Sequence, residues 1–135
     1  MKNENHIIIP KNVWGPVYWD FLYVLSLTSP QTLTPKQKQL YTLLISNFSE
    51  FLPCKECREN YKYEIDKINI NINDRSDLLY LILHLHNSVR VKQQKKKFTV
   101  HDVKKYFLNY KSYSYVFTFI LCLLLINALR CYFFV

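Results

Sequence analysis

The sequence predicts an all-α protein: a four-helix bundle, a short fifth helix and then a C-terminal transmembrane helix. Three observations support this fold class. Apolar residues recur at helical spacing along most of the chain. The 135 residues include a single glycine, Gly15, which excludes the Gly-rich phosphate loops of dinucleotide-binding sheets and P-loop proteins. An uncharged apolar run then occupies residues 113–129. The length suits one compact domain.

The first half of the chain predicts two amphipathic helices. The first ends before Ser29-Pro30, because proline disfavours helical backbone in the preceding residue. Its apolar face comprises Val17, Tyr18, Phe21, Leu22 and Leu25. The second begins at Thr34, the N-cap, with Pro35 in the first turn and Gln37 completing a capping box. Its predicted buried side comprises Leu40, Leu43, Leu44, Phe48 and Phe51.

Three further helices follow. One is predicted from Cys54 to about Ile68, and the short alternation NININD at 69–74 is interpreted as a loop. The next runs from about Ser76 to Lys92. Its apolar face comprises Leu78, Ile82, Leu85, His86 and Val89. QQKKK at 93–97 is a basic turn, and Thr99 with Asp102 caps a short fifth helix.

The apolar run 113–129 predicts a membrane anchor. As a helix it would span roughly 26 Å, near the lower limit for a bilayer, and further if Arg130 snorkels. The alternative is a core helix, but one so uniformly apolar would overfill a small core. We therefore expect an N-terminal extension (1–13), a helical domain (14–111) and an anchor (112–135). Lysines precede the anchor and no signal peptide is apparent, so the helical domain is expected in the cytosol, on a host or virion membrane.

The composition suggests an anionic partner, with 18 lysines and arginines against 10 acidic residues. Charge alone does not separate nucleic acid from a phosphate-bearing cofactor or an anionic membrane. With one glycine, any nucleotide cofactor must be held by side chains on helices. Four cysteines are too few for a disulfide-stapled secreted domain.

The motif PCKEC at 53–57 is compatible with either a redox disulfide or half a zinc site. A helix N-terminus lowers the pKa of its first cysteine, which favours redox chemistry, although the βαβ context of thioredoxins is absent. Zinc would recruit His84 and His86, or His101. His84 and His86 lie about 200° apart around a helix, so both cannot reach one metal. His86 by itself is equally compatible with a core histidine.

Three motifs together resemble the Erv/ALR family of FAD-linked sulfhydryl oxidases. They are WGPVYWDFLY from Trp14, PCKEC from Pro53 and HNSVRVKQQKKKF from His86, in the family's order and spacing. The resemblance spans roughly residues 14–110. The small size and few cysteines resemble the members found in large cytoplasmic DNA viruses.

The resemblance implies FAD held by aromatic residues and histidine within the bundle, with no metal. Gly15 would permit close backbone approach, Trp19 would stack on adenine, and Lys95 would lie near the phosphates, although its neighbours Lys92, Lys96 and Lys97 are alternatives. Tyr23 stands where the family usually has histidine, and Arg90 where it usually has asparagine. The positions matching the family's cofactor pocket are Gly15, Trp19, Tyr23, His86, Asn87, Val89, Lys95 and Phe98.

The implied activity is FAD-dependent thiol oxidation, in which two protein thiols and O2 give a disulfide and hydrogen peroxide, in a viral disulfide-forming pathway. Cys54 would exchange with the substrate or a thioredoxin-like carrier, and Cys57 would face the flavin. A homodimer is implied; nucleic acid is not expected. Cys122 and Cys131 lie nine apart and are not expected to bond, so no shuttle pair is evident. The alternative is a membrane-anchored adaptor or zinc module without redox activity.

Overall fold

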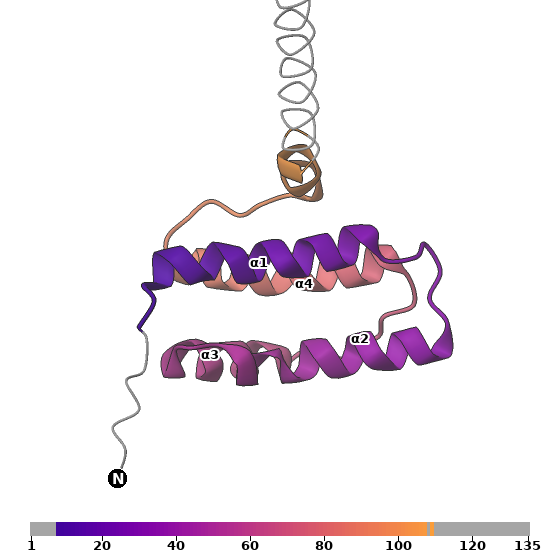
Figure 1. Ribbon diagram of the computed structural model, residues 1–135, viewed down its shortest axis with the longest axis horizontal. Helices are drawn as coiled ribbons and strands as arrows, with labels where there is room; N and C mark the ends of the chain where they lie inside the picture. Colours follow the sequence, from indigo (N-terminus) through magenta and orange to yellow (C-terminus); the bar gives the residue numbers. More distant parts are fainter. Residues whose placement is uncertain (1–7, 108, 110–135) are drawn as a thin grey trace, which may run out of the picture. The chain divides into compact units, whose positions relative to one another are not determined.

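The computed structural model describes residues 8–107 and 109, and this part is helical. The elements are α1 (Lys11–Thr28), α2 (Pro35–Asn47), the 3-10 turn η1 (Phe48–Phe51), α3 (Lys55–Ile65) and α4 (Arg75–Lys92) (Figure 1). The predicted order of four helices is confirmed. α3 ends three residues earlier than expected, and residues 69–73 form a loop as predicted.

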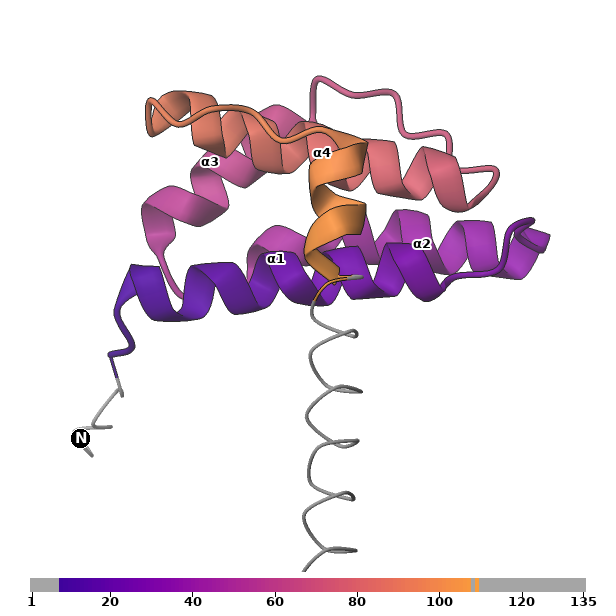
Figure 2. The ribbon, with the colours of Figure 1, turned by 90° about the horizontal axis from the view of Figure 1, so that it is seen from above.

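The four helices form two layers, α1 with α4 and α2 with α3, and η1 joins α2 to α3 (Figures 1 and 2). α1 and α4 run antiparallel. The Arg75 Nε atom at the start of α4 donates to the Ser29 carbonyl beyond the end of α1, at 2.6 Å. Farther along, Trp19 stacks on His86. The largest fully buried apolar side chains are Leu22, Ile45, Leu78, Ile82 and Leu85.

Local capping residues set the starts of α2 and of the short helix that follows Thr99. Thr34 caps α2 with the predicted capping box: its hydroxyl accepts from the Gln37 N–H, and the Gln37 side chain accepts from the Thr34 N–H at 2.9 Å. Residues 100–107 form the predicted short helix, which belongs to a second compact unit that begins at Thr99. There the Asp102 carboxylate accepts from the Thr99 N–H at 2.8 Å.

The predicted buried faces of α1 and α2 are partly wrong. Leu22 is buried as expected, whereas the exposed members of those sets are Val17, Phe21, Leu40, Leu43 and Phe51. α2 stops at Asn47 and continues as η1, so residues beyond it leave the 3.6-residue period. α2 also carries apolar residues on two sides, and the bundle covers the side with Ile45 and Phe48.

Among the described residues, no helix is both long enough and apolar enough to span a bilayer. The expected transmembrane segment, residues 112–135, lies outside the described part of the chain, together with Cys122 and Cys131.

Candidate functional site

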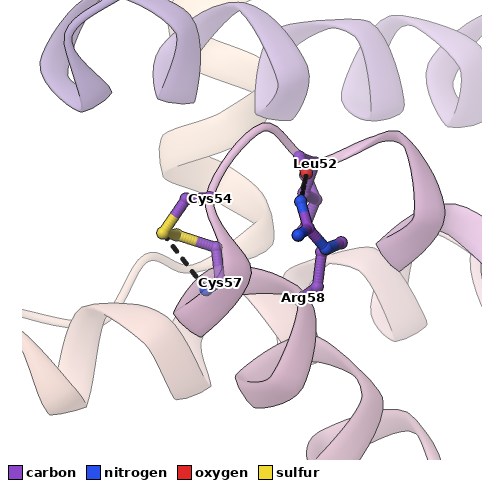
Figure 3. The surroundings of a disulfide bond; sticks show 4 residues. All are labelled: Leu52, Cys54, Cys57 and Arg58. Atoms are coloured by element: carbon purple, nitrogen blue, oxygen red, sulfur yellow. Dashed lines mark hydrogen bonds between the residues drawn. A yellow bond between two sulfur atoms is a disulfide. The ribbon is translucent and has the colours of Figure 1, made fainter. Parts of the chain in front are cut away.

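Cys54 and Cys57 form a disulfide at the N-terminus of α3 (Figure 3). Their Cα atoms are 5.1 Å apart. Cys54 is the N-cap residue, and its Sγ accepts from the Cys57 N–H at 3.2 Å. Both residues are half-buried. A sulfur at this position is stabilised as thiolate by free backbone N–H groups and the helix dipole, which suits a pair that cycles between disulfide and dithiol.

The loop that carries the disulfide is held from two sides. The Arg58 Nη1 atom donates to the Leu52 carbonyl at 2.7 Å, which closes the loop back onto α3 (Figure 3). The Tyr18 hydroxyl of α1 donates to the Phe51 carbonyl at 2.9 Å. These bonds fix the backbone just before Cys54 without contacting the sulfur atoms.

A cluster of aromatic rings around Phe48 supports this loop. Tyr18 from α1 and Tyr61 from α3 pack on Phe48 with ring centroids 5.8 and 5.9 Å away. The Tyr61 hydroxyl donates to the buried Ile45 carbonyl at 2.8 Å, and burial raises the pKa of Tyr61. The cluster joins α1, η1 and α3 just ahead of the disulfide.

A second group, the ring cluster, comprises Trp19, Tyr23, His86 and Phe98. Trp19 and His86 stack with centroids 4.4 Å apart and planes 10° from parallel. Phe98 meets His86 edge-on at 5.3 Å. The Asn87 side chain fixes Phe98 by donating to its carbonyl at 2.9 Å and accepting from its N–H at 2.8 Å. The structure therefore brings together residues that the sequence separates widely.

Gly15, Trp19 and Tyr23 lie on one stripe of α1, because each is four residues from the next. A Cβ placed on Gly15 would meet no atom within 4 Å, so the backbone there borders open space. Trp19 itself is half-buried. Val89 lies one turn beyond His86 on α4 and is half-buried too. The open space beside Gly15 thus lies one turn of α1 from Trp19.

Two cations lie close to the ring cluster. The Arg90 guanidinium sits 3.6 Å from the centroid of Phe98, and its Nε donates to the Lys96 carbonyl at 2.6 Å. Burial, then the charges of Arg90 and Lys95, lowers the pKa of His86 from 6.5 to about 4. The sequence prediction missed Arg90 as a site residue; its position four residues after His86, on the same helix face, was the available signal.

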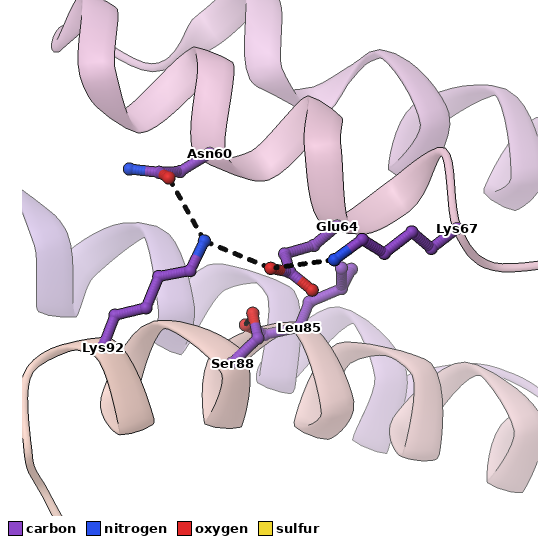
Figure 4. Close-up of polar contacts among 6 residues, drawn as sticks. All are labelled: Asn60, Glu64, Lys67, Leu85, Ser88 and Lys92. Carbon is purple, nitrogen blue, oxygen red and sulfur yellow. Dashed lines mark hydrogen bonds and ion pairs between the residues drawn. The ribbon is translucent and has the colours of Figure 1, made fainter.

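Lys92, at the end of α4, contacts residues of α3. Its Nζ lies 3.1 Å from a Glu64 carboxylate oxygen and donates to the Asn60 side chain at 3.1 Å, both on α3 (Figure 4). Lys67 also approaches Glu64, at 3.8 Å. These contacts tie α3 to α4 and separate Lys92 from the candidates for phosphate binding, leaving Lys95 as the lysine whose charge acts on His86.

The structure places two predicted site residues, Tyr23 and Trp19, directly against His86. Tyr23 is 3% exposed, and its hydroxyl bonds to His86 Nδ1 at 3.0 Å; its contribution to a cofactor site stays a prediction. Trp19 and His86 are in direct contact, so a third ring cannot lie between them at this separation. An adenine ring would have to stack on an outer face of the pair.

His84 and His86 lie in different surroundings, as their spacing predicts. His84 is exposed and lines a shallow groove with Asp77 and Tyr80, whereas His86 belongs to the ring cluster. In the described part of the chain, no group of three or more His, Cys, Asp or Glu residues could hold a metal ion.

The lowered pKa of His86 makes stability depend on pH. In the unfolded chain His86 is protonated below about pH 6.5. In the folded protein the His86 ring stays neutral down to about pH 4. The unfolded state thus binds more protons, so the free energy of unfolding falls as the pH decreases through this window. We expect a loss of up to about 2 kcal/mol between about pH 7.5 and pH 5, limited by the ring's partial solvent contact.

Urea unfolding at the two pH values measures this loss. A His86→Gln variant should lose that part of the pH dependence, and His84→Gln should retain it. Equal pH dependence in all three proteins would contradict the assignment.

Residues 16–108, most of the chain, match the Erv1 / Alr family. The chain belongs to this family. The Erv1 / Alr match covers the disulfide motif and the whole ring cluster, and it confirms the family predicted from the sequence.

Named relatives in the Erv1 / Alr family include viral proteins. An African swine fever virus FAD-linked sulfhydryl oxidase is 31% identical over 83 residues, covering 62% of this chain and 70% of the relative. A probable FAD-linked sulfhydryl oxidase of Acanthamoeba polyphaga mimivirus is 27% identical over 114 residues, covering 79% and 80%. The yeast Erv1 core superposes with a TM-score of 0.67 at 23% identity over 78% of this chain and 90% of its own, which shows a shared fold.

Proposed function

We propose that the protein is an FAD-dependent thiol oxidase that forms disulfides in protein substrates and reduces O2 to hydrogen peroxide. The proposal rests on one observation: neighbouring residues of α1 contact both the disulfide loop and the ring cluster. Tyr18 supports the Cys54–Cys57 loop, and its neighbour Trp19 stacks in the ring cluster. One helix thus joins a redox disulfide to an aromatic, cationic ligand site. Relatives named FAD-linked sulfhydryl oxidases support the activity.

The first step is thiol–disulfide exchange at α3. A substrate thiolate attacks Cys54 Sγ, the Cys54–Cys57 bond breaks, and Cys57 leaves as a thiolate near the positive end of the helix. A second substrate thiolate then attacks the mixed disulfide at the substrate sulfur. The substrate leaves with a disulfide bond, and both cysteines are reduced, holding the electron pair and the protons that the substrate gave up.

The residues of the ring cluster fit an FAD. Trp19, His86 and Phe98 offer aromatic surface, and Gly15 permits close approach of the ligand to the α1 backbone. Arg90 and Lys95 bring positive charge for the phosphates. When bound, FAD supplies the two-electron acceptor that reoxidises the dithiol and passes the pair to O2, giving hydrogen peroxide.

The purified full chain tests the proposal. A visible absorption spectrum should show a flavin, and dithiothreitol or a reduced protein should drive O2 consumption with matching peroxide release. A colourless protein with stoichiometric zinc would replace the proposal by the zinc-module alternative. A colourless, zinc-free protein that forms no peroxide would favour the adaptor.

We also propose a homodimer formed through α1. Val13, Val17, Phe21 and Val24 are spaced by four, four and three residues, so they form one stripe, and all four are exposed. Val17 is 63% exposed and Phe21 52%. An apolar helix stripe of this kind suits packing against its own copy.

A Val17→Glu variant should therefore be monomeric, because dimerisation would bury its charge. Analytical ultracentrifugation in detergent measures the mass. Tyr80→Glu is the matched control, since Tyr80 is 61% exposed on α4 and should leave the dimer intact. A Val17→Glu dimer as tight as wild type would rule out this interface.

For location, we propose that residues 112–135 anchor the protein in a membrane with the oxidase domain in the cytosol. The uncharged run 113–129 and the lysines before it support this topology. An oxidase facing a reducing compartment would serve a dedicated pathway, such as a virus oxidising its own proteins, directly or through a thioredoxin-like carrier. Protease added to sealed microsomes should digest the domain without detergent; a protected domain would overturn this topology.

A further inference from the structure

Tyr23 and His86 form a hydrogen bond between α1 and α4 inside the ring cluster. The Tyr23 hydroxyl lies 3.0 Å from His86 Nδ1, and the two rings are tilted by 49° with centroids 5.7 Å apart. Tyr23 is almost fully buried at 3% exposure. It therefore lies behind the histidine, in the protein interior.

This bond constrains the protonation of the imidazole. A neutral histidine carries one ring proton, and its other nitrogen is an acceptor. When the phenol donates to Nδ1, the proton must be on Nε2, which then becomes the donor nitrogen. Trp19 covers one face of the ring and Phe98 meets it edge-on, so the orientation of the imidazole is fixed as well.

We propose that Tyr23 is a positioning residue that holds His86 as the Nε2–H tautomer, so that His86 presents a hydrogen-bond donor to the cofactor. The inference rests on the proposed FAD function for its ligand, but its chemistry concerns residues of this chain alone. A histidine in place of Tyr23 could itself gain a proton in the physiological range; a phenol stays a neutral donor there.

Burial is the main influence that keeps both rings of the pair neutral. From α4, Arg90 acts on both rings, and Lys95 acts on His86 from the loop that follows. Both cations oppose a charged imidazolium. Burial raises the pKa of Tyr23; the charge of Arg90 works against this rise, and the negative charge of Asp20 on α1 adds to it, so the phenol keeps its proton. The surroundings thus hold a neutral phenol against a neutral imidazole.

The test compares Tyr23→Phe with wild type in the full-length protein. Long-range ¹H–¹⁵N NMR spectra report the tautomer of His86 and its titration, and flavin fluorescence reports the Kd for FAD. We expect wild type to be Nε2–H. The variant should be a mixture of tautomers, with FAD bound roughly three- to tenfold more weakly, the worth of one hydrogen bond.

Tyr61→Phe is the matched control. Among the described residues, Tyr61 is the other buried tyrosine with a hydrogen-bonded hydroxyl, but it bonds to the Ile45 carbonyl. Removing the Tyr61 hydroxyl should lower the free energy of unfolding but leave the His86 NMR signals and the Kd for FAD unchanged.

Three results would overturn the inference: an Nδ1–H tautomer in wild type, an unchanged tautomer in Tyr23→Phe, or the same spectral change in Tyr61→Phe. The wild-type NMR spectrum alone tests the predicted Nε2–H tautomer, even if Tyr23→Phe fails to fold. A wild type that shows the Nε2–H tautomer but binds no FAD would refute the proposed oxidase and leave the Tyr23–His86 assignment standing.

Discussion

Replacing either Cys54 or Cys57 by serine will abolish thiol oxidation while the protein keeps its flavin. A serine oxygen cannot form the disulfide that accepts the substrate's electron pair, so exchange stops at the first step. The loss should be roughly a thousandfold or more in kcat, as expected when a nucleophile is removed. Binding should persist because the ring cluster draws its residues from α1, α4 and the segment after α4.

O2 consumption with dithiothreitol and the flavin absorbance of the same samples measure the two effects separately. The control is Cys122→Ser with Cys131→Ser, which removes the cysteines outside the described residues and should leave dithiothreitol oxidation intact. Full activity in either Cys54→Ser or Cys57→Ser would show that the redox centre lies elsewhere.

Trp19→Ala and His86→Ala should each release the flavin. The two rings stack at 4.4 Å, and either change removes one half of that platform. Stacking of an aromatic side chain on a nucleobase contributes about 1–3 kcal/mol, so we expect Kd for FAD to rise roughly 5- to 150-fold. His86→Ala also removes the partner of the Tyr23 hydroxyl.

Each of these variants has a matched control on its own helix. Trp14→Ala removes a tryptophan of α1 that packs on Tyr18, at 5.4 Å, and should spare FAD affinity. His84→Ala removes an exposed histidine of α4. Circular dichroism establishes that all four proteins fold, and equilibrium dialysis gives Kd. Equal flavin loss in a variant and its control would contradict a specific role for the ring cluster.

The sequence predicts the helices and their caps because these depend on residues close together in the chain. The Thr34 capping box and the stop before Ser29-Pro30 involve neighbours only, and both are confirmed. Periodicity also placed Leu78, Ile82 and Leu85 of α4 in the core correctly. The assignment of Trp19 and His86 to one cofactor pocket is different, since it came from resemblance to a family.

Contacts across the bundle explain the remaining errors. Leu40 and Leu43 are as apolar as Ile45, and only the position of the neighbouring helices decides which of them is covered. The depth of Tyr23 likewise depends on how closely α1 packs against α4, which its motif does not specify. The guanidinium of Arg90 lies over Phe98 because the loop after α4 turns back, which no local pattern encodes.

The short spacing of the two cysteines has a consequence for the fold during turnover. Cys54 and Cys57 are three positions apart, so their bond closes a very small loop and removes little disorder from the unfolded chain. On the chain-entropy model that constraint contributes only about 2 kcal/mol, less than a bond between distant segments would. The Tyr18–Phe51, Arg58–Leu52 and Tyr61–Ile45 hydrogen bonds do not involve the sulfur atoms. The bond can therefore open and close in every cycle while the architecture around it persists.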